Sequence, residues 1–154
     1  MSEKTQTETM AGKLPPQNLD AEKSLIGAIL IDEEVLADAS EIVKPNDFYD
    51  KNHGLIFAGM MRLFEKHKPV DLLTLTDELK RKDELELIGG SAYLTELTNY
   101  VPTAAHAAAY AEMVAQTAVR RRLIKASSGI TELGYDESTT TQELLEKAEA
   151  ELFS

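Results

Sequence analysis

The longest uninterrupted pattern in this chain runs from Thr103 to Leu133, and it constrains the fold most strongly because it favours helix throughout. The stretch contains no proline, is rich in alanine, and has only one glycine before Gly134. Its apolar residues step by four, three, four and three positions: Val119, Leu123, Ala126, Ile130 and Leu133. This spacing is typical of a coiled-coil seam, which is narrower than the apolar stripe of a helix that lies on a globular core. We therefore expect one long helix here, or two collinear ones.

A second helix is expected from Thr141 to Phe153, after a turn over residues 134–140. Two helices joined by a short turn pack antiparallel, so residues 103–154 are predicted to form a helical hairpin. Such a hairpin has more apolar surface than it can bury within itself, and a second copy is expected to cover the remainder. The predicted dimer residues are Val119, Leu123, Ala126, Ile130, Leu133, Leu145, Ala148 and Leu152.

The residues before the hairpin are also expected to be helical. Apolar side chains recur at three- and four-residue spacing in residues 25–30, 35–42 and 55–64. Residues 70–75 resemble a short strand, but no partner strand is expected elsewhere, so this segment is assigned as the approach to a helix. The sequence therefore predicts an all-α fold, with a compact multi-helix head over residues 15–102 followed by the long helical hairpin.

Polar residues mark the expected helix starts in the head. Asp20 follows the proline pair at 15–16 and stands where the N-cap of the first helix is expected. Thr74 is followed three residues later by Asp77, as in a capping box, so a helix is expected from Thr74 to Lys82. Ser91, after a glycine pair, is expected to cap a further helix.

Composition and charge exclude several classes of protein. The chain has 154 residues, 43% of them hydrophobic, which is enough for one cored domain, and residues 1–14 have so few apolar side chains that a disordered tail is expected. There is no cysteine, and no apolar run is long enough for a membrane span, so a cytoplasmic protein is expected. The formal net charge of −11 opposes attraction to phosphate, so this chain is expected to bind DNA weakly or not at all.

No catalytic or cofactor-binding motif is found in the sequence. A nucleotide-binding phosphate loop needs glycines followed by Lys and then Ser or Thr, but the glycine pair at 89–90 is followed by Ser91 and Ala92. The histidines, at 53, 67 and 106, are too dispersed to predict a metal site. A hydrolase that uses Asp47 and Asp71 is disfavoured, because no base, metal set or phosphate loop accompanies them. We therefore expect no enzyme activity, cofactor or metal in this chain.

Five short motifs occur in order along the chain. They are the segment from Pro15 to Leu30, Asp47-Phe48-Tyr49, Pro69-Val70-Asp71, the run from Gly89 to Leu94, and Val101-Pro102-Thr103-Ala104-Ala105. Each motif alone is ordinary helix and turn sequence. Together, over Pro15–Ser154, they resemble the N-terminal domain of bacterial replicative DNA helicases of the DnaB type.

The resemblance carries expectations about partners and about the parent protein. In this family the N-terminal domains dimerise through their hairpins, form a collar as a trimer of dimers on a hexameric ring, and dock the C-terminal domain of primase. The residues whose positions match candidate primase contacts are Asp20, Tyr93, Ile124 and Ile130. The ATPase domain, with its ATP and magnesium, is expected outside this chain. The end directly after the apolar Phe153 favours a boundary within a longer protein, and a natural end at Ser154 is the alternative.

Two further points stay open at the level of sequence. A helicase loader is an additional partner that the resemblance allows. The alternative function is an acidic helical adaptor or dimerisation module unrelated to replication, which would share the hairpin but have no affinity for a primase.

Overall fold

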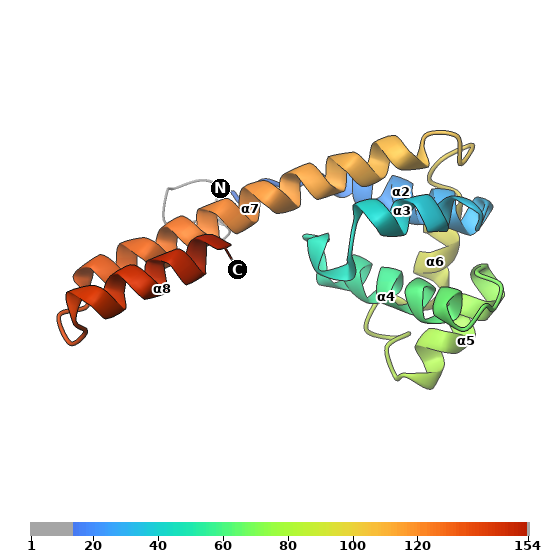
Figure 1. Cartoon of the computed structure of the whole chain (residues 1–154). Coiled ribbons are helices and arrows are strands. Elements are labelled where there is room, and N and C mark those ends of the chain that lie inside the picture. Colours follow the sequence, from blue (N-terminus) through green and yellow to red (C-terminus); the bar gives the residue numbers. More distant parts are fainter. Residues whose placement is uncertain (1–13, 154) are drawn as a thin grey trace, which may run out of the picture. The chain divides into compact units, whose positions relative to one another are not determined.

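The computed structural model describes residues 14–153, and every regular element within this range is helical (Figure 1). The elements are α2 (Leu19–Ile31), α3 (Val35–Ile42), a short 3₁₀ helix η1 (Pro45–Asp47), α4 (Lys51–Glu65), α5 (Leu72–Arg81), α6 (Gly90–Thr98), α7 (Ala107–Tyr135) and α8 (Thr141–Phe153). The all-α prediction is confirmed. The tail expected over residues 1–14 lies outside the described residues, apart from Leu14.

Two compact units make up the described chain. The head unit is Gln17–Ala118, and the hairpin unit comprises residues from Val119 onward together with residues up to Pro16. The first part of α7 therefore belongs to the head, although the sequence assigns residues 103–154 to the hairpin. The reason is local packing, because Ala107, Ala111 and Val114 on α7 are buried as part of the head's hydrophobic core.

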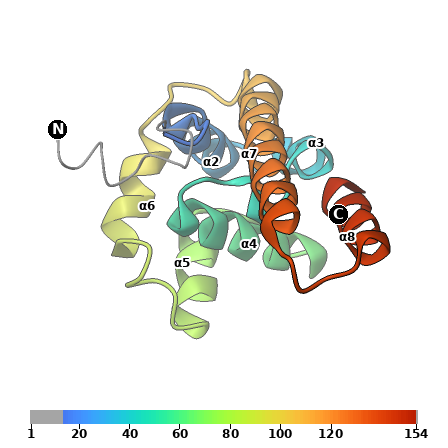
Figure 2. The same cartoon turned by 90° about the vertical axis from the view of Figure 1, so that its left-hand side faces the viewer.

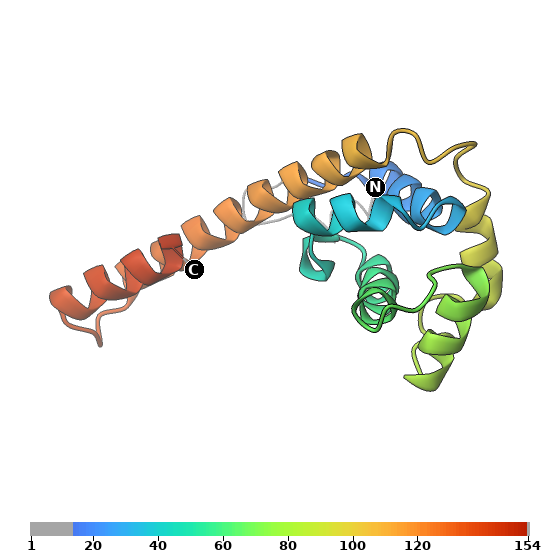
Figure 3. The same cartoon turned by 45° about the vertical axis from the view of Figure 1, so that its right-hand side comes forward.

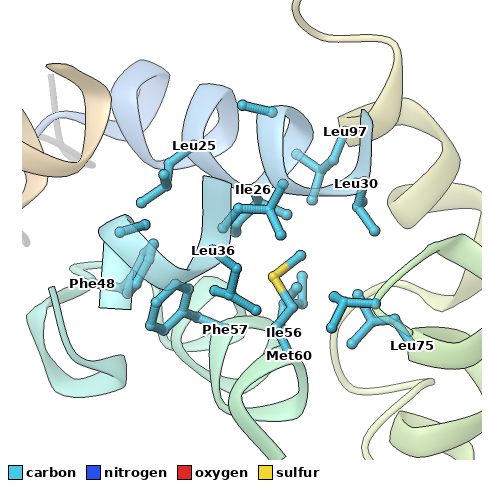
Figure 4. Close-up of a cluster of buried hydrophobic side chains, with 14 of the residues drawn as sticks. Leu25, Ile26, Leu30, Leu36, Phe48, Ile56, Phe57, Met60, Leu75 and Leu97 are labelled. Carbon is cyan, nitrogen blue, oxygen red and sulfur yellow. The ribbon is translucent and has the colours of Figure 1, made fainter. Parts of the chain in front are cut away.

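The core of the head is built from the apolar faces of its helices (Figure 4). Fully buried side chains come from α2, α3, α4, α5 and α6, and include Leu25, Ile26, Ile29, Leu36, Ile56, Phe57, Met60, Leu75, Leu79, Leu94 and Leu97. Each such side chain contributes about 1.5–3 kcal/mol through removal from water. The three- and four-residue spacing noted in the sequence is what brings these side chains to one side of each helix.

A glycine allows α2 and α6 to pack closely. A Cβ atom added at Gly27 would lie 2.3 Å from the carbonyl oxygen of Leu97, closer than real Cβ contacts allow. The two helices contact each other in the head, where Figure 2 shows α6 next to α2. Only glycine fits at this position without a backbone shift.

The helix caps differ from those expected. Asn18 is the N-cap of α2, its Oδ1 accepting a hydrogen bond from Ala21 N at 3.0 Å, so the prediction for Asp20 is wrong by two residues. Asp71 caps α5 in a capping box with Thr74, which starts that helix earlier than predicted. An amide or carboxylate side chain just before the helix reaches the N3 amide better than a residue already inside the first turn.

The start of α6 is set by backbone conformation. Its N-cap is Gly89, which has a φ of +107°, and Ser91 lies one residue inside the helix, so the expected Ser91 cap is also wrong. A positive φ of this kind is readily adopted by glycine because it has no Cβ. The glycine pair therefore turns the chain, and no side-chain cap is required.

In the hairpin unit, α8 has the predicted bounds, Thr141–Phe153. Figure 3 shows α7 and α8 running antiparallel. The turn between them is held by Asp136, whose carboxylate accepts hydrogen bonds from Ser138 N at 3.0 Å and from Thr139 Oγ1 at 2.9 Å. A hydrogen bond from the Ser138 hydroxyl, followed by these two, lowers the pKa of Asp136. The turn residues thus close the hairpin locally.

Candidate protein-protein interface

The hairpin unit presents apolar side chains in two settings. Four of the predicted dimer residues are partly buried within the unit, namely Ala126, Ile130, Leu133 and Ala148. The other four are exposed to solvent, with exposed fractions of 54% for Val119, 61% for Leu123, 64% for Leu145 and 57% for Leu152. The seam that the sequence predicts as one set is thus divided. Part of it packs inside the hairpin, and part is left on the outside.

A groove lies between the two helices of the hairpin. It has a volume of about 490 Å³, and its walls include Val119, Leu123 and Ala126 of α7 and Leu152 of α8. Charged side chains also line it, since Arg122, Lys125 and Glu151 contribute to its walls. An apolar groove with a few charged groups is the type of surface that an amphipathic helix can occupy.

The carboxylate of Glu151 on α8 lies against Gly129 on α7. A Cβ atom added at Gly129 would lie 2.9 Å from Cδ and Oε1 of Glu151. Glu151 also lines a second groove of about 350 Å³, together with Leu133, Lys147 and Ala150. Glu151 therefore lines two grooves of the hairpin unit.

The four candidate primase contacts fall on both units. Ile124 and Ile130 lie on the hairpin part of α7, where Ile124 is 39% exposed and Ile130 is partly buried. Asp20 lies in the first turn of α2, and its Oδ1 accepts a hydrogen bond from the Tyr100 hydroxyl at 2.7 Å. That bond is the largest cause of a raised pKa for Tyr100. Of the two hairpin candidates, Ile124 offers the more exposed side chain.

Tyr93, the remaining candidate, is half-buried, and its hydroxyl turns into the head. The hydroxyl oxygen lies 2.6 Å from Nε2 of His53. Burial, followed by the charges of Asp50, Glu96 and Glu22, raises the pKa of Tyr93 to about 12. A partner protein can therefore reach only part of the Tyr93 ring, because its hydroxyl is hydrogen-bonded within the head.

Glu22 and His53 complete this polar network. Both side chains are fully buried, and Nδ1 of His53 lies 2.8 Å from Oε1 of Glu22. The other carboxylate oxygen of Glu22 accepts a hydrogen bond from Tyr49 N at 2.7 Å. The network links α2, the start of α4 and α6. Sequence reasoning missed both residues, because Glu22 and His53 stand far apart along the chain and no local pattern connects them.

Two absences hold within residues 14–153. No group of three or more His, Asp or Glu side chains is placed so that it could hold a metal ion. None of the described helices is long and apolar enough to cross a membrane. The described residues present exposed apolar side chains and hydrogen-bonded carboxylates.

Comparison with known proteins assigns the chain to a family. The family described as "DnaB-like helicase N terminal domain" matches residues 14–116. The replicative DNA helicase DnaC of Bacillus subtilis (strain 168) is 41% identical over 143 residues, which cover 93% of this chain and 32% of that protein. The chain thus spans about a third of the length of this relative.

Solved structures agree with this match. The N-terminal domain of DnaB helicase from Mycobacterium tuberculosis superposes with a TM-score of 0.87 at 38% identity, covering 90% of this chain and 98% of that one. A DnaB-like replicative helicase, described with its interactions with primase, shares the fold at 24% identity with a TM-score of 0.73, covering 88% of this chain and 31% of that one. With its helical head, its hairpin and a match over most of its length, the chain belongs to the family of DnaB-like helicase N-terminal domains.

Proposed function

We propose that this chain serves as the assembly and primase-docking domain of a replicative DNA helicase. The observation that carries the proposal is the exposed apolar groove of the hairpin, on a chain of this family. Large apolar side chains gathered on one exposed surface mark a protein interaction site. The domain does no chemistry of its own in this proposal, and it acts by holding other proteins.

Self-association is the first of the two proposed roles. Leu123 and Leu152 line the groove and are more than half exposed, so a second hairpin that covers them would remove their apolar surface from water. The dimers would then assemble as a trimer of dimers in the hexamer of the parent protein. The half-buried Ile130 and Ala148 would contribute mainly to the packing of each hairpin.

Primase docking is the second role. Support comes from the DnaB-like helicase of similar fold whose structure was described with its interactions with primase. Ile124 is the favoured contact because it is exposed on α7 and lies outside the set of predicted dimer residues. The other three candidates are weaker. Ile130 is partly buried in the hairpin. The side chains of Asp20 and Tyr93 make hydrogen bonds within the head. The partner would be the C-terminal domain of primase.

The parent protein would unwind duplex DNA at the replication fork, with ATP and magnesium bound by an ATPase domain outside these residues. A loader protein would be a further partner of the parent protein. The parent protein would be located in the cytoplasm. Direct DNA binding by this domain would be weak, because a net charge of −11 repels phosphate. The alternative function, an adaptor unrelated to replication, is unsupported, because the chain matches the family of DnaB-like helicase N-terminal domains.

Calorimetric titration of the cognate primase C-terminal domain into this chain tests the docking role. Binding to the wild type and at least about tenfold weaker binding to Ile124→Ala are expected, the loss typical of an interface anchor. Leu87→Ala is the matched control, because Leu87 is an exposed leucine in the head. Circular dichroism would verify that both variants are folded. If the wild type gives no heat of binding and does not co-elute with the primase domain, the docking role is contradicted and assembly remains as the function.

A further inference from the structure

The charges of the hairpin unit are divided between two stretches of sequence. Residues 119–130 of α7 hold four Lys and Arg residues and no acid, and we call them the basic stretch. Residues 131–153, which include the turn and α8, hold seven Asp and Glu residues and one Lys, and we call them the acidic stretch. A surface with its charges divided in this way favours some orientations of a partner over others.

The two stretches are offset along the hairpin. The carboxylate of Glu151 lies against Gly129, which sets the register of the antiparallel helices α7 and α8 (Figure 3). At about 1.5 Å per residue in each helix, Lys125 and Glu149 then lie about 9 Å apart along the axis, and the arginines at 120–122 lie further from Glu149. Among the described residues, no ion pair joins Lys125 to an acid of α8. The hairpin therefore does not pair these charges within itself.

The hairpin groove described above belongs to the basic stretch. Its apolar walls include Val119 and Leu123, and its cationic walls are Arg122 and Lys125. Glu151 is the only acid among the described residues that line it, and this side chain is partly buried against α7 of its own hairpin. An occupant of the groove therefore meets apolar side chains and a surplus of positive charge.

The helix α8 carries a surface that matches this groove. Leu145 and Leu152 are exposed, seven residues apart on one face of α8, and exposed Glu149 lies between them on that face. Glu146, which is also exposed, stands three residues before Glu149. α8 thus presents leucines flanked by carboxylates, which complement apolar walls flanked by cations. Because every copy of the chain has both surfaces, two copies can exchange them about a two-fold axis.

We propose that two copies of this chain pair with their hairpins antiparallel, so that Glu146 and Glu149 of each copy face Arg122 and Lys125 of the other. This inference rests on the proposed self-association and adds the orientation of the copies and the charges that fix it. An antiparallel pair brings each acidic stretch over the basic stretch of the other copy. A parallel pair would set like charges opposite each other in both stretches, which is unfavourable.

Sedimentation of charge-reversal variants of the whole chain, at about 150 mM salt, tests this orientation. Arg122→Glu/Lys125→Glu should dimerise at least about tenfold more weakly than the wild type, because carboxylates then face carboxylates. The quadruple variant that adds Glu146→Lys/Glu149→Lys has both sets of charges exchanged and should recover most of the lost affinity. In a parallel pair, by contrast, the quadruple variant would gain nothing over the wild type, and the double variant would lose nothing.

The matched control is Lys51→Glu/Lys68→Glu, which makes the same change in net charge on exposed residues of the head and should leave dimerisation unchanged. Circular dichroism would verify that each variant stays helical. Wild-type affinity of Arg122→Glu/Lys125→Glu would overturn the proposed orientation, and so would a quadruple variant as weak as the double variant. If Leu123→Asp still disrupts the wild-type dimer in that case, self-association through the hairpin stands without this orientation. A wild type that stays monomeric up to about 1 mM would contradict both proposals.

Discussion

Nε2 of His53 lies 2.6 Å from the hydroxyl oxygen of Tyr93, and the planes of the two rings are nearly parallel, with an angle of 3° between them. This bond joins α4 to α6, and through Glu22 on the far side of His53 it reaches α2. Because His53 and Glu22 are fully buried, the two ring nitrogens of His53 depend on Glu22 and Tyr93 for their hydrogen bonds. The stability of the head should therefore be sensitive to each member.

Removal of the Tyr93 hydroxyl should destabilise the head. In Tyr93→Phe, Nε2 of His53 loses its bond partner, which costs about 1–3 kcal/mol of unfolding free energy for a buried polar group. Urea denaturation measures the loss. Tyr100→Phe is the matched control, because it deletes an exposed hydroxyl bonded to Asp20 and should cost less than about 0.5 kcal/mol. Equal effects of the two substitutions would contradict a structural role for the buried bond.

Substitution of Gly27 by alanine should be strongly destabilising. The added methyl group would lie 2.3 Å from the Leu97 carbonyl oxygen, so α2 and α6 must move apart, at a cost of about 3 kcal/mol or more. Gly134→Ala provides the opposite case, since nothing lies within 4 Å of its added Cβ and the residue is within α7. Alanine there should stabilise the chain by about 0.5–1 kcal/mol. Thermal unfolding of both variants measures whether stability falls for Gly27→Ala and rises for Gly134→Ala.

A charge in the hairpin groove should prevent self-association. Leu123→Asp would bury an unpaired carboxylate in the proposed dimer, at a cost of several kcal/mol. Sedimentation of the variant should show a smaller mass than that of the wild type at equal concentration. Leu87→Asp, on the exposed surface of the head, should leave the mass unchanged. If the wild type and Leu123→Asp have the same mass at all concentrations, the hairpin groove is not the interface.

Acid should weaken the contribution of Glu78 to stability. Burial would raise the pKa of Glu78, but hydrogen bonds from Arg62 and Arg81 outweigh burial and lower it from 4.5 to about 2 in the folded protein. Its ionised form is therefore favoured by folding. That contribution is present above pH 4.5 and is lost as the pH falls towards 2. The wild type should therefore have a higher unfolding free energy than Glu78→Gln. The difference should be largest at neutral pH and should shrink below pH 4.5.

Denaturant titrations at a series of pH values between 7 and 3 would measure this difference. Glu86→Gln is the control, because Glu86 is an exposed acid of the same head and no ion pair involving its carboxylate is found among the described residues. A difference between wild type and Glu78→Gln that stays constant through this pH range would contradict the ionic role of Glu78.

The sequence by itself determined the helical class, the family and the bounds of α8, because each depends on local features. Apolar spacing at three and four residues defines a helix without reference to the rest of the chain, and proline and glycine pairs limit where it can extend. Helix starts were less predictable. Asp20 and Asn18 are both good capping residues within one turn, and only the backbone conformation selects Asn18.

Tertiary structure alone decided which polar and apolar side chains meet. Glu22, His53 and Tyr93 stand 31 and 40 residues apart in sequence, so no periodicity could connect them. The same holds for the hairpin, where Ile130 and Leu123 belong to one spacing pattern but differ in burial. The spacing of apolar residues predicts which face of a helix is apolar, whereas the burial of that face depends on what packs against it. The division of the seam into an inner part and an exposed part is therefore a property of the folded hairpin.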